Sequence, residues 1–379
     1  MKINNTHSSS KKSRRDFLKQ FSLGVGAASI AIASPSFASS LFRPKLKSGN
    51  KRLGIALVGL GSYSTYQLAP ALQETENCYL AGIVTGTPSK AESWMDKYDI
   101  PKQNIYNYEN FDEITNNKDI DIIYVVLPNS MHAEFTIRAA RAGKHVICEK
   151  PMALNVTECE SMIKACEDNK VRLAIGYRIQ FEETMKEVMR LGQEEEFGKI
   201  QLINGSAGFL MRDNKNWRTR KNMGGGPMQD IGIYALNAAR MITGQEPLWV
   251  TAQAYNSRPE LFTEINETVT WQMQFTGGAI ANLTGSFGMY VRDLFVTAED
   301  GWISMNPYWT YNGIRATTSD GPIEFPERFQ QAVQLDEMAR CFMENETFRA
   351  DGYEGLKDVK IINAIEESIL NDGKKITII

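Results

Sequence analysis

The sequence predicts an α/β plus α+β protein. The expected N-terminal domain has a Rossmann fold, and the expected C-terminal domain is built on a large, mostly antiparallel, open sheet. Apolar strands alternate with helices over residues 53–176, which indicates right-handed crossovers and a parallel sheet. A glycine-rich turn follows the first of these strands. Beyond residue 199, long strands alternate apolar and polar residues, which is typical of an antiparallel sheet with one solvated face.

Length and charge set outer limits on the function. A chain of 379 residues has room for two domains that each bury a core. The net charge is −3, but the first 38 residues carry six Lys or Arg and one acid, so the remainder has 36 basic and 44 acidic residues. We therefore expect no nucleic-acid partner, and no membrane partner beyond the N-terminal segment.

Cysteine and histidine usage argues against a metal site. The five cysteines form no C-x-x-C pair and no cluster with the three histidines, so we expect no bound metal. We interpret the cysteines as small buried apolar residues: Cys78, Cys148, Cys159, Cys166 and Cys341.

Residues 1–38 are predicted to be a targeting segment rather than part of the fold. Arg14-Arg15 lies in a twin-arginine signal, and residues 21–33 are too short an apolar run for a bilayer, which needs roughly 20 residues. Ser36 and Ala38, in Ser36-Phe37-Ala38, offer small side chains at the cleavage positions, although the sequence leaves open whether the segment is cleaved or kept as an anchor. We expect export to the periplasm by the twin-arginine route, and we interpret residues 39–52 as a linker or arm.

A dinucleotide-binding fingerprint follows the strand expected at 53–58. Its turn runs into a helix expected at 65–73, with Ser64 in the third glycine position. Gly59 permits the tight turn and Gly61 lets the backbone approach a pyrophosphate, which the helix N-terminus favours. We expect this loop to bind the cofactor through Gly59, Gly61, Ser62, Tyr63 and Ser64.

The next strand, expected at 79–84, ends without an acid. An NAD-specific site usually places Asp or Glu about 20 residues after the fingerprint, bonded to the ribose 2′-hydroxyl. Hydroxyl groups, a glycine and a lysine stand there instead, and these suit a 2′-phosphate. We therefore predict NADP, with NAD less favoured, bound here by Thr85, Gly86, Thr87 and Lys90.

The strand–helix pattern then repeats to the end of the first domain. Strands are expected at 119–127, 145–148 and 172–177, with a short extended piece at 105–108 and helices at 89–98, 132–142 and 156–169. The carboxyl ends of parallel strands meet at one edge of a sheet, where ligands bind. Pro151 ends its strand and keeps Lys150 extended over that edge. We expect further cofactor contacts from Leu127, Pro128, Asn129, His132, Glu149 and Lys150.

The second domain is expected to span residues 177–379. A charged helix is predicted at 181–196, and Gly277-Gly278 reads as a hairpin turn. The helices expected at 329–344 and 355–370 are predicted to cover one side of the sheet, and its open face suits a homodimer or homotetramer. The strands are expected at 200–210, 248–256, 268–275, 279–287, 293–298 and 302–305.

A glycine-rich stretch between the first two of these strands holds further candidate residues. Gly224 to Gly226 and Pro227 precede a predicted helix, in which Asp230 and Tyr234 share one face and Asn237 lies one turn further along it. Second candidates for contacts with substrate or nicotinamide are Arg178, Trp217 and Arg218.

These motifs together resemble the glucose–fructose oxidoreductase family. The resemblance implies that Lys150, Asp230 and Tyr234 are the catalytic positions, and many relatives have His where this chain has Tyr234. It also implies hydride transfer between a pyranose C1 and a nicotinamide. The segments that carry the resemblance are 56–61, 127–135, 142–152, 175–178, 224–237 and 270–275.

We interpret Tyr234 as the group that takes the hydroxyl proton while hydride leaves. A free phenol has a pKa of ~10, and an ammonium within ~4–6 Å, here Lys150, favours the phenolate. Asp230 would orient the sugar hydroxyls, and a second sugar would reoxidise a cofactor that stays bound. Two alternatives remain open: an NAD-dependent glycosidase of the same superfamily, and a non-catalytic nucleotide-binding sensor. The sequence does not identify the sugars.

Overall fold

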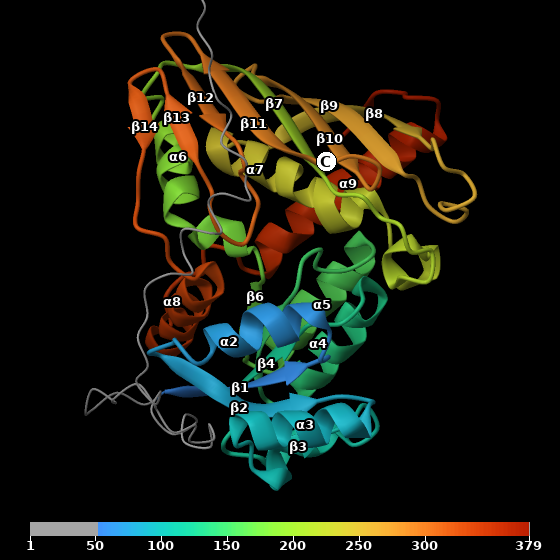
Figure 1. Cartoon of the computed structure of the whole chain (residues 1–379), viewed down its shortest axis with the longest axis vertical. Coiled ribbons are helices and arrows are strands. Elements are labelled where there is room, and N and C mark those ends of the chain that lie inside the picture. Colours follow the sequence, from blue (N-terminus) through green and yellow to red (C-terminus); the bar gives the residue numbers. More distant parts are fainter. Residues whose placement is uncertain (1–51, 379) are drawn as a thin grey trace, which may run out of the picture. The chain divides into compact units, whose positions relative to one another are not determined.

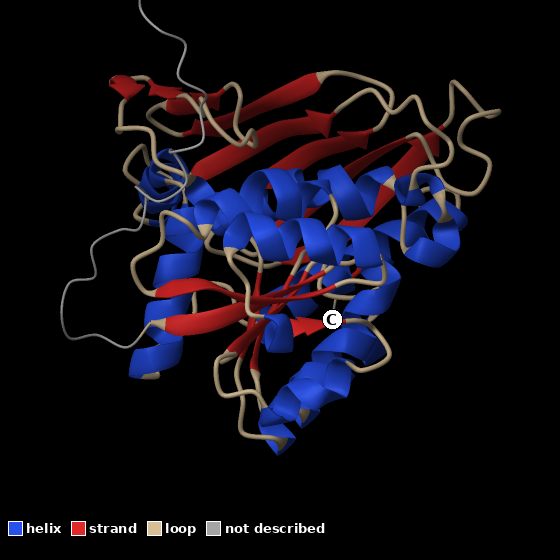
Figure 2. Ribbon diagram, turned by 60° about the horizontal axis from the view of Figure 1, so that its bottom comes forward, coloured by secondary structure: helices blue, strands red, loops and turns tan. Residues whose placement is uncertain are grey.

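The computed structural model describes residues 52–378. The predicted signal at 1–38, and all but the last residue of the predicted arm at 39–52, therefore lie outside the described residues. The described chain forms two sheets with helices packed between and around them (Figures 1 and 2). Within this part of the chain, no helix combines the length and the apolar character needed to cross a membrane.

The N-terminal sheet has six strands, all parallel, in the order β3-β2-β1-β4-β5-β6. This is the strand order of a Rossmann fold, so the predicted fold class is confirmed. All six residues of β1 are buried because the sheet is covered on both faces. The strands are β1 (Leu53–Val58), β2 (Cys78–Val84), β3 (Ile105–Tyr106), β4 (Ile122–Val125), β5 (His145–Cys148) and β6 (Leu173–Ile175).

Helices cover both faces of this sheet. Helices α4 (His132–Arg141) and α5 (Val156–Asp168) pack on one face, and α3 (Pro88–Tyr98) contributes Trp94 to the core on the other. A π-helical turn at Ser64–Leu68 and the short α2 (Ala69–Ala71) also lie on that second face, together with α8 (Gln330–Glu344). The chain therefore returns to the N-terminal domain near its end.

The position of α8 corrects a sequence prediction. Both final helices were expected to cover the C-terminal sheet, but Leu335 and Met338 of α8 pack with Leu57 and Ile83 of the N-terminal sheet. The Asp336 carboxylate accepts the backbone N–H groups of the loop before β2, at 2.7–3.0 Å. The apolar face of α8 predicts that this helix is buried, but it does not identify which of the two sheets the helix covers.

The C-terminal sheet has nine strands, in the order β14-β13-β12-β11-β7-β10-β9-β8-β15. All neighbours are antiparallel except β7 and β10, so the predicted mostly antiparallel sheet is confirmed. Its strands are β7 (Ile200–Gly208), β8 (Pro247–Tyr255), β9 (Thr268–Phe275), β10 (Ile280–Ser286), β11 (Val291–Ala298), β12 (Trp302–Met305), β13 (Ala316–Thr318), β14 (Gly321–Ile323) and β15 (Ile376–Thr377).

Three helices lie beside this sheet on the side of the N-terminal domain: α6 (Glu183–Gln193), α7 (Ile233–Thr243) and α9 (Gly352–Leu370). Helix α7 packs on β7 and β10, while α9 contacts β8 as well as α5 and β6 of the first domain. The helices therefore join the two domains into one continuous hydrophobic core. The opposite face of the sheet carries no helix of the described chain (Figure 1).

Candidate functional site

A cleft of about 1250 Å³ follows the carboxyl edge of the six-stranded sheet and extends against the C-terminal domain. The four strand ends that the sequence predicted to converge all line it, with residues from the ends of β1, β2, β4 and β5. The predicted catalytic residues Lys150, Asp230 and Tyr234 line the same cleft. The fold therefore places the candidate nucleotide-binding residues and the candidate catalytic residues in the same cleft.

The glycine-rich loop has the geometry that a pyrophosphate requires. Gly59 has φ of +94°, and a Cβ there would lie 2.4 Å from the carbonyl oxygen of Val126, so only glycine fits. A Cβ on Gly61 would meet no atom within 4 Å, which leaves its backbone open to a ligand. Ser62 and Tyr63 line the cleft beside it. Ser64 does not; its buried hydroxyl donates to the carbonyl of Gly59 at 2.6 Å and holds the turn.

The end of β2 lies next to this loop. The Lys90 ammonium donates to the carbonyl oxygen of Leu60 at 3.1 Å, so its charge lies at the glycine-rich turn. The Thr85 hydroxyl accepts the backbone N–H of Thr87 at 3.2 Å, and all three side chains line the cleft. Gly86 does not itself line the cleft; it packs on the ring of Tyr108, which does. A cation and two hydroxyls without a carboxylate fit a 2′-phosphate.

The ends of β4 and β5 are fastened together by His132. This buried imidazole lies between the carbonyl oxygens of Leu127 and Pro151, at 2.9 and 2.8 Å, and burial lowers its pKa, so the neutral ring donates its one N–H to one of the two carbonyls. The amide of Asn129 donates to the carbonyl of Gly224 at 2.8 Å, which ties this edge to the second domain. The predicted residues Leu127, Pro128, Asn129 and His132 all line the cleft. His132 thus fixes the peptide on which Lys150 is mounted.

The catalytic candidates form one contact group. The Lys150 ammonium donates to the backbone carbonyl of Asp230 at 2.7 Å and lies 4.6 Å from the centroid of the Tyr234 ring. The Arg178 guanidinium is 5.1 Å from the same centroid. The Asp230 carboxylate pairs with Arg218 at 2.9 Å, and this partner raises the pKa of the guanidinium. Two cations therefore flank one phenol, and a carboxylate held by a third cation lies beside it.

The helix that carries Asp230 and Tyr234 is not regular. Residues Met228–Gly232 form a π-helical turn before α7 begins at Ile233. The turn lies directly on the sheet, because a Cβ on Gly285 of β10 would come within 2.7 Å of the Cα of Gly232. Local π-helical turns are frequent at functional sites. Asn237, predicted on the same face as Asp230 and Tyr234, is buried, with its amide bonded to Gln180 and Asp358.

Sequence reasoning missed an aromatic loop that closes the cleft after β12. Its members include Trp309, whose ring stacks on Tyr234 at 5.8 Å, and Tyr311, whose ring stacks on Tyr63 at 6.0 Å. Buried Arg178 donates to the carbonyls of Trp309 and Thr310, so it fixes this loop as well as flanking Tyr234. The aromatic run at 308–311, in a loop after a short strand, was the available signal.

Glu149 adds a carboxyl group to the floor of the cleft. The Tyr124 hydroxyl donates to it at 2.6 Å, and burial raises the pKa of this carboxyl. Burial, and then the charge of Glu149, raise the pKa of Tyr63 well above its usual value. Trp217 and Arg218, placed by a helical turn at Trp217–Thr219, also line the cleft. No cluster of metal-binding side chains occurs in the described chain.

Comparisons with known proteins agree with this geometry. Residues 53–177 match the oxidoreductase family with an NAD-binding Rossmann fold (GFO_IDH_MocA), and residues 185–304 match the GFO/IDH/MocA C-terminal domain. The resemblance drawn from the motifs is therefore confirmed. The D-xylose 1-dehydrogenase [NADP(+)] of Haloarcula marismortui is 26% identical over 326 residues, which is 83% of this chain and 90% of that protein.

Solved structures give the same result. The aldose–aldose oxidoreductase of Caulobacter crescentus, in complex with glycerol, is 38% identical, with a TM-score of 0.84 over 86% of this chain and all of that one. A scyllo-inositol dehydrogenase of Lactobacillus casei, solved with NAD(H) and scyllo-inositol, has a TM-score of 0.71 at 20% identity. That match covers 86% of this chain and 99% of the other, and at this identity it shows the shared fold alone.

Proposed function

Because the chain belongs to the GFO/IDH/MocA family of oxidoreductases, we propose that it is an NADP-dependent sugar oxidoreductase that oxidises the C1 hydroxyl of an aldopyranose. One observation carries the proposal. The ammonium of Lys150 and the guanidinium of Arg178 flank the ring of Tyr234 at the wall of the cleft. The names of the similar xylose dehydrogenase and aldose–aldose oxidoreductase support the choice of an aldose.

The residues of the site account for the proton transfer that accompanies hydride transfer. Bound NADP supplies the hydride acceptor. Tyr234 takes the C1 hydroxyl proton as the hydride leaves, and its two cationic neighbours stabilise the phenolate that this requires. Asp230, with one oxygen on Arg218, presents its other oxygen to sugar hydroxyls. Trp309 and Trp217 supply aromatic faces on which a pyranose ring can lie.

The choice of NADP depends on the end of β2. Thr85, Thr87 and Lys90 line the cleft there, and Lys90 reaches the glycine-rich loop. An acid at this strand end would favour NAD and the glycosidase alternative, and none is present. Two xylose dehydrogenases among the relatives are named for NADP(+).

The proposal is tested by adding single aldoses to purified protein supplied with NADP and following the absorbance of the reduced nicotinamide. Reduction by an aldose, reversed when a ketose or second aldose is added, is the expected result. A non-catalytic sensor would give binding without reduction. A glycosidase would release a sugar from a glycoside without net reduction.

We also propose that the protein is exported to the periplasm in a folded state. The proposal rests on Arg14-Arg15, which precedes the described residues. Replacing both arginines by lysine should leave the precursor in the cytoplasm, whereas replacing Lys11 and Lys12 by arginine should not. Export of the double lysine variant at the normal level would remove the proposal.

A homo-oligomer through the outer face of the nine-stranded sheet completes the proposal. That face carries a ladder of amides, in which Gln272 donates to Asn282 at 2.8 Å and Asn282 donates to Asn204 at 3.2 Å. Beside it, the rings of Phe295 and Trp302 stack at 5.9 Å although 39% and 37% of these residues is exposed. Light scattering of the wild type and of Phe295→Glu measures the oligomeric state. A monomeric wild type would contradict the proposal.

A further inference from the structure

A small cavity of about 20 Å³ lies behind Tyr234 and shares Lys150 and Tyr234 with the cleft. Its remaining polar lining consists of Tyr177, Gln180 and Asn237, which come from the end of β6, the turn after it and helix α7. The cavity therefore adjoins the proposed proton-transfer pair on the side away from the glycine-rich loop.

One oxygen of this lining, the side-chain oxygen Oε1 of Gln180, is buried and has no hydrogen-bond partner in the described chain. A buried polar group left in this way destabilises the folded state unless a water molecule satisfies it. A cavity needs roughly 10–15 Å³ and two to four polar partners to hold a water molecule, and this one meets both conditions.

We propose that this cavity binds one water molecule that connects Gln180 to Lys150, and that Gln180 is a positioning residue for the Lys150 ammonium. The water donates to Gln180 Oε1 and accepts an N–H of Lys150. Lys150 has hydrogens for this, because the ammonium has three and one is used on the Asp230 carbonyl. The proposal deepens the proposed function and rests on it for the role of Lys150.

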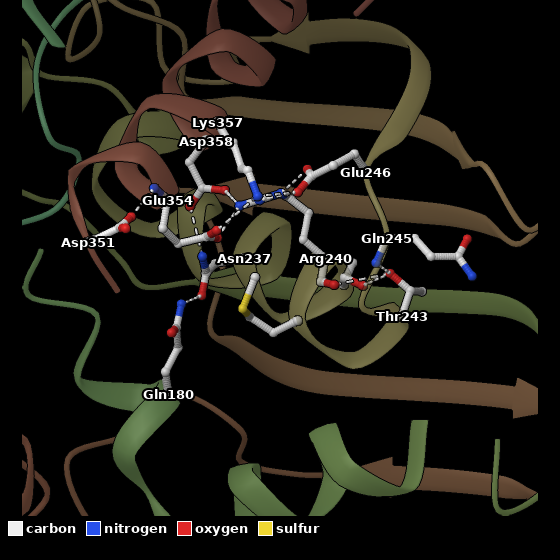
Figure 3. Close-up of polar contacts among 12 residues, drawn as sticks. Gln180, Asn237, Arg240, Thr243, Gln245, Glu246, Asp351, Glu354, Lys357 and Asp358 are labelled. Atoms are coloured by element: carbon white, nitrogen blue, oxygen red, sulfur yellow. Dashed lines mark hydrogen bonds and ion pairs between the residues drawn. The ribbon is translucent and has the colours of Figure 1, made fainter. Parts of the chain in front are cut away.

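The orientation of the Gln180 amide follows from a buried charge network (Figure 3). Asp358 and Arg240 form an ion pair in which both side chains are fully buried. The Asp358 carboxylate can only accept, so Asn237 must turn its NH₂ group toward it, at 2.9 Å. The oxygen of Asn237 then faces Gln180, which must donate its own NH₂ group, also at 2.9 Å. Oε1 is therefore the atom of Gln180 left for the cavity.

This polarity suits a cation on the other side of the cavity. A carbonyl oxygen favours an ammonium, directly or through water, whereas an NH₂ group would repel it. The network is fastened at its far end by Glu354, which accepts from Arg240 at 2.7 Å, and by Glu246 at 2.8 Å. Buried ion pairs add little net stability compared with apolar packing, so fixing a geometry is the better account of this one.

The first experiment compares Gln180→Met with Gln334→Met. Gln334, in α8, is a matched control, because it is equally buried, also has an unpartnered side-chain oxygen, and lines neither the cleft nor the cavity. Single-turnover reduction of bound NADP by an aldose, measured over sugar concentration, gives the hydride-transfer rate and the half-saturating concentration.

Gln180→Met should slow hydride transfer by about tenfold or more, because the water-mediated hydrogen bond that positions the Lys150 ammonium is lost. The half-saturating sugar concentration should stay within about twofold, since Gln180 makes no substrate contact. Asn237→Leu removes the group that orients Gln180, so it should slow the same step, and combining it with Gln180→Met should cost little more. Equal rates in Gln180→Met and Gln334→Met, or an effect confined to the half-saturating concentration, would overturn the inference.

A crystal structure of the wild-type protein at high resolution tests the water independently of turnover. Density for a water within hydrogen-bonding distance of Gln180 Oε1 and Lys150 Nζ is expected, and a dry cavity overturns the inference. If no aldose reduces NADP in the wild type, the proposed function fails and the role of Gln180 fails with it. If the wild type turns over and Gln180→Met matches its control, only the inference about Gln180 fails.

Discussion

Replacing Lys150 by methionine tests the electrostatic basis of the proposed chemistry. Methionine keeps most of the length and apolar volume of lysine and removes the charge. In the structure the ammonium lies 4.6 Å from the centroid of the Tyr234 ring. With an effective dielectric constant of ~20, a unit positive charge roughly 4–6 Å from the negative charge that develops in the transition state contributes about 3–4 kcal/mol. At 1.36 kcal/mol per decade, hydride transfer should slow by roughly 100- to 1000-fold.

Single-turnover reduction of bound NADP, followed across pH, measures this loss. Lys164→Met is the control, because this lysine is exposed on α5 and pairs with Asp168 in the next helical turn. A Lys150→Met rate within a few-fold of wild type at every pH would refute the assignment. If the free energy of unfolding of Lys150→Met fell by as much as its activation free energy rose, the slower rate would be explained by the lost contact with Asp230 instead.

Four further predictions concern single substitutions. Tyr234→Phe should preserve folding and NADP binding and slow hydride transfer by ~10²–10⁴, measured in single turnover. Thr85→Asp should weaken NADP by roughly 1–2 kcal/mol relative to NAD, measured by fluorescence titration; a wild type that already prefers NAD would contradict the interpretation of this strand end. Arg240→Met should lower the free energy of unfolding by about 3–5 kcal/mol in denaturant titrations, because Asp358 is left buried and unpaired. Burial raises the pKa of Glu149, so its ionisation disfavours the folded state; Glu149→Gln should therefore raise the free energy of unfolding at pH ~7 and give no gain below pH ~4, where this carboxyl is neutral in both states.

The sequence predicted the elements that have a strong period and left out those without one. The bounds of β1, β5, β9 and β12 agree with the prediction, because each is a short apolar or alternating run closed by a turn or a charge. Strands β13, β14 and β15 have two or three residues each, too few to show a period. The partner of α8 was wrong because an apolar helix face carries no information about which sheet it meets.

The candidate site also has a part that could be predicted from the sequence and a part that could not. Its backbone half was predictable, since the geometry requires glycine at position 59, where φ is positive, and a proline after Lys150 marks the end of its strand. The half that depends on contacts distant in sequence was not. Tyr311 reaches Tyr63, Trp309 reaches Tyr234, and Arg178 holds both aromatic residues in place, yet nothing in the sequence around them indicates these partners.

The irregular helix at 228–243 shows why contacts between residues distant in sequence matter for function. A regular helix would place Asp230, Tyr234 and Asn237 on one face, as the sequence predicted. In the structure a π-helical turn at 228–232 lies against Gly285, and Asn237, which lines the small cavity together with Tyr234, also reaches into the core toward Asp358. The helix is thereby fixed from behind by a buried charge while Tyr234 faces the cleft. Because that charge also orients Gln180, the position of Tyr234 and the surroundings of Lys150 depend on the same contacts.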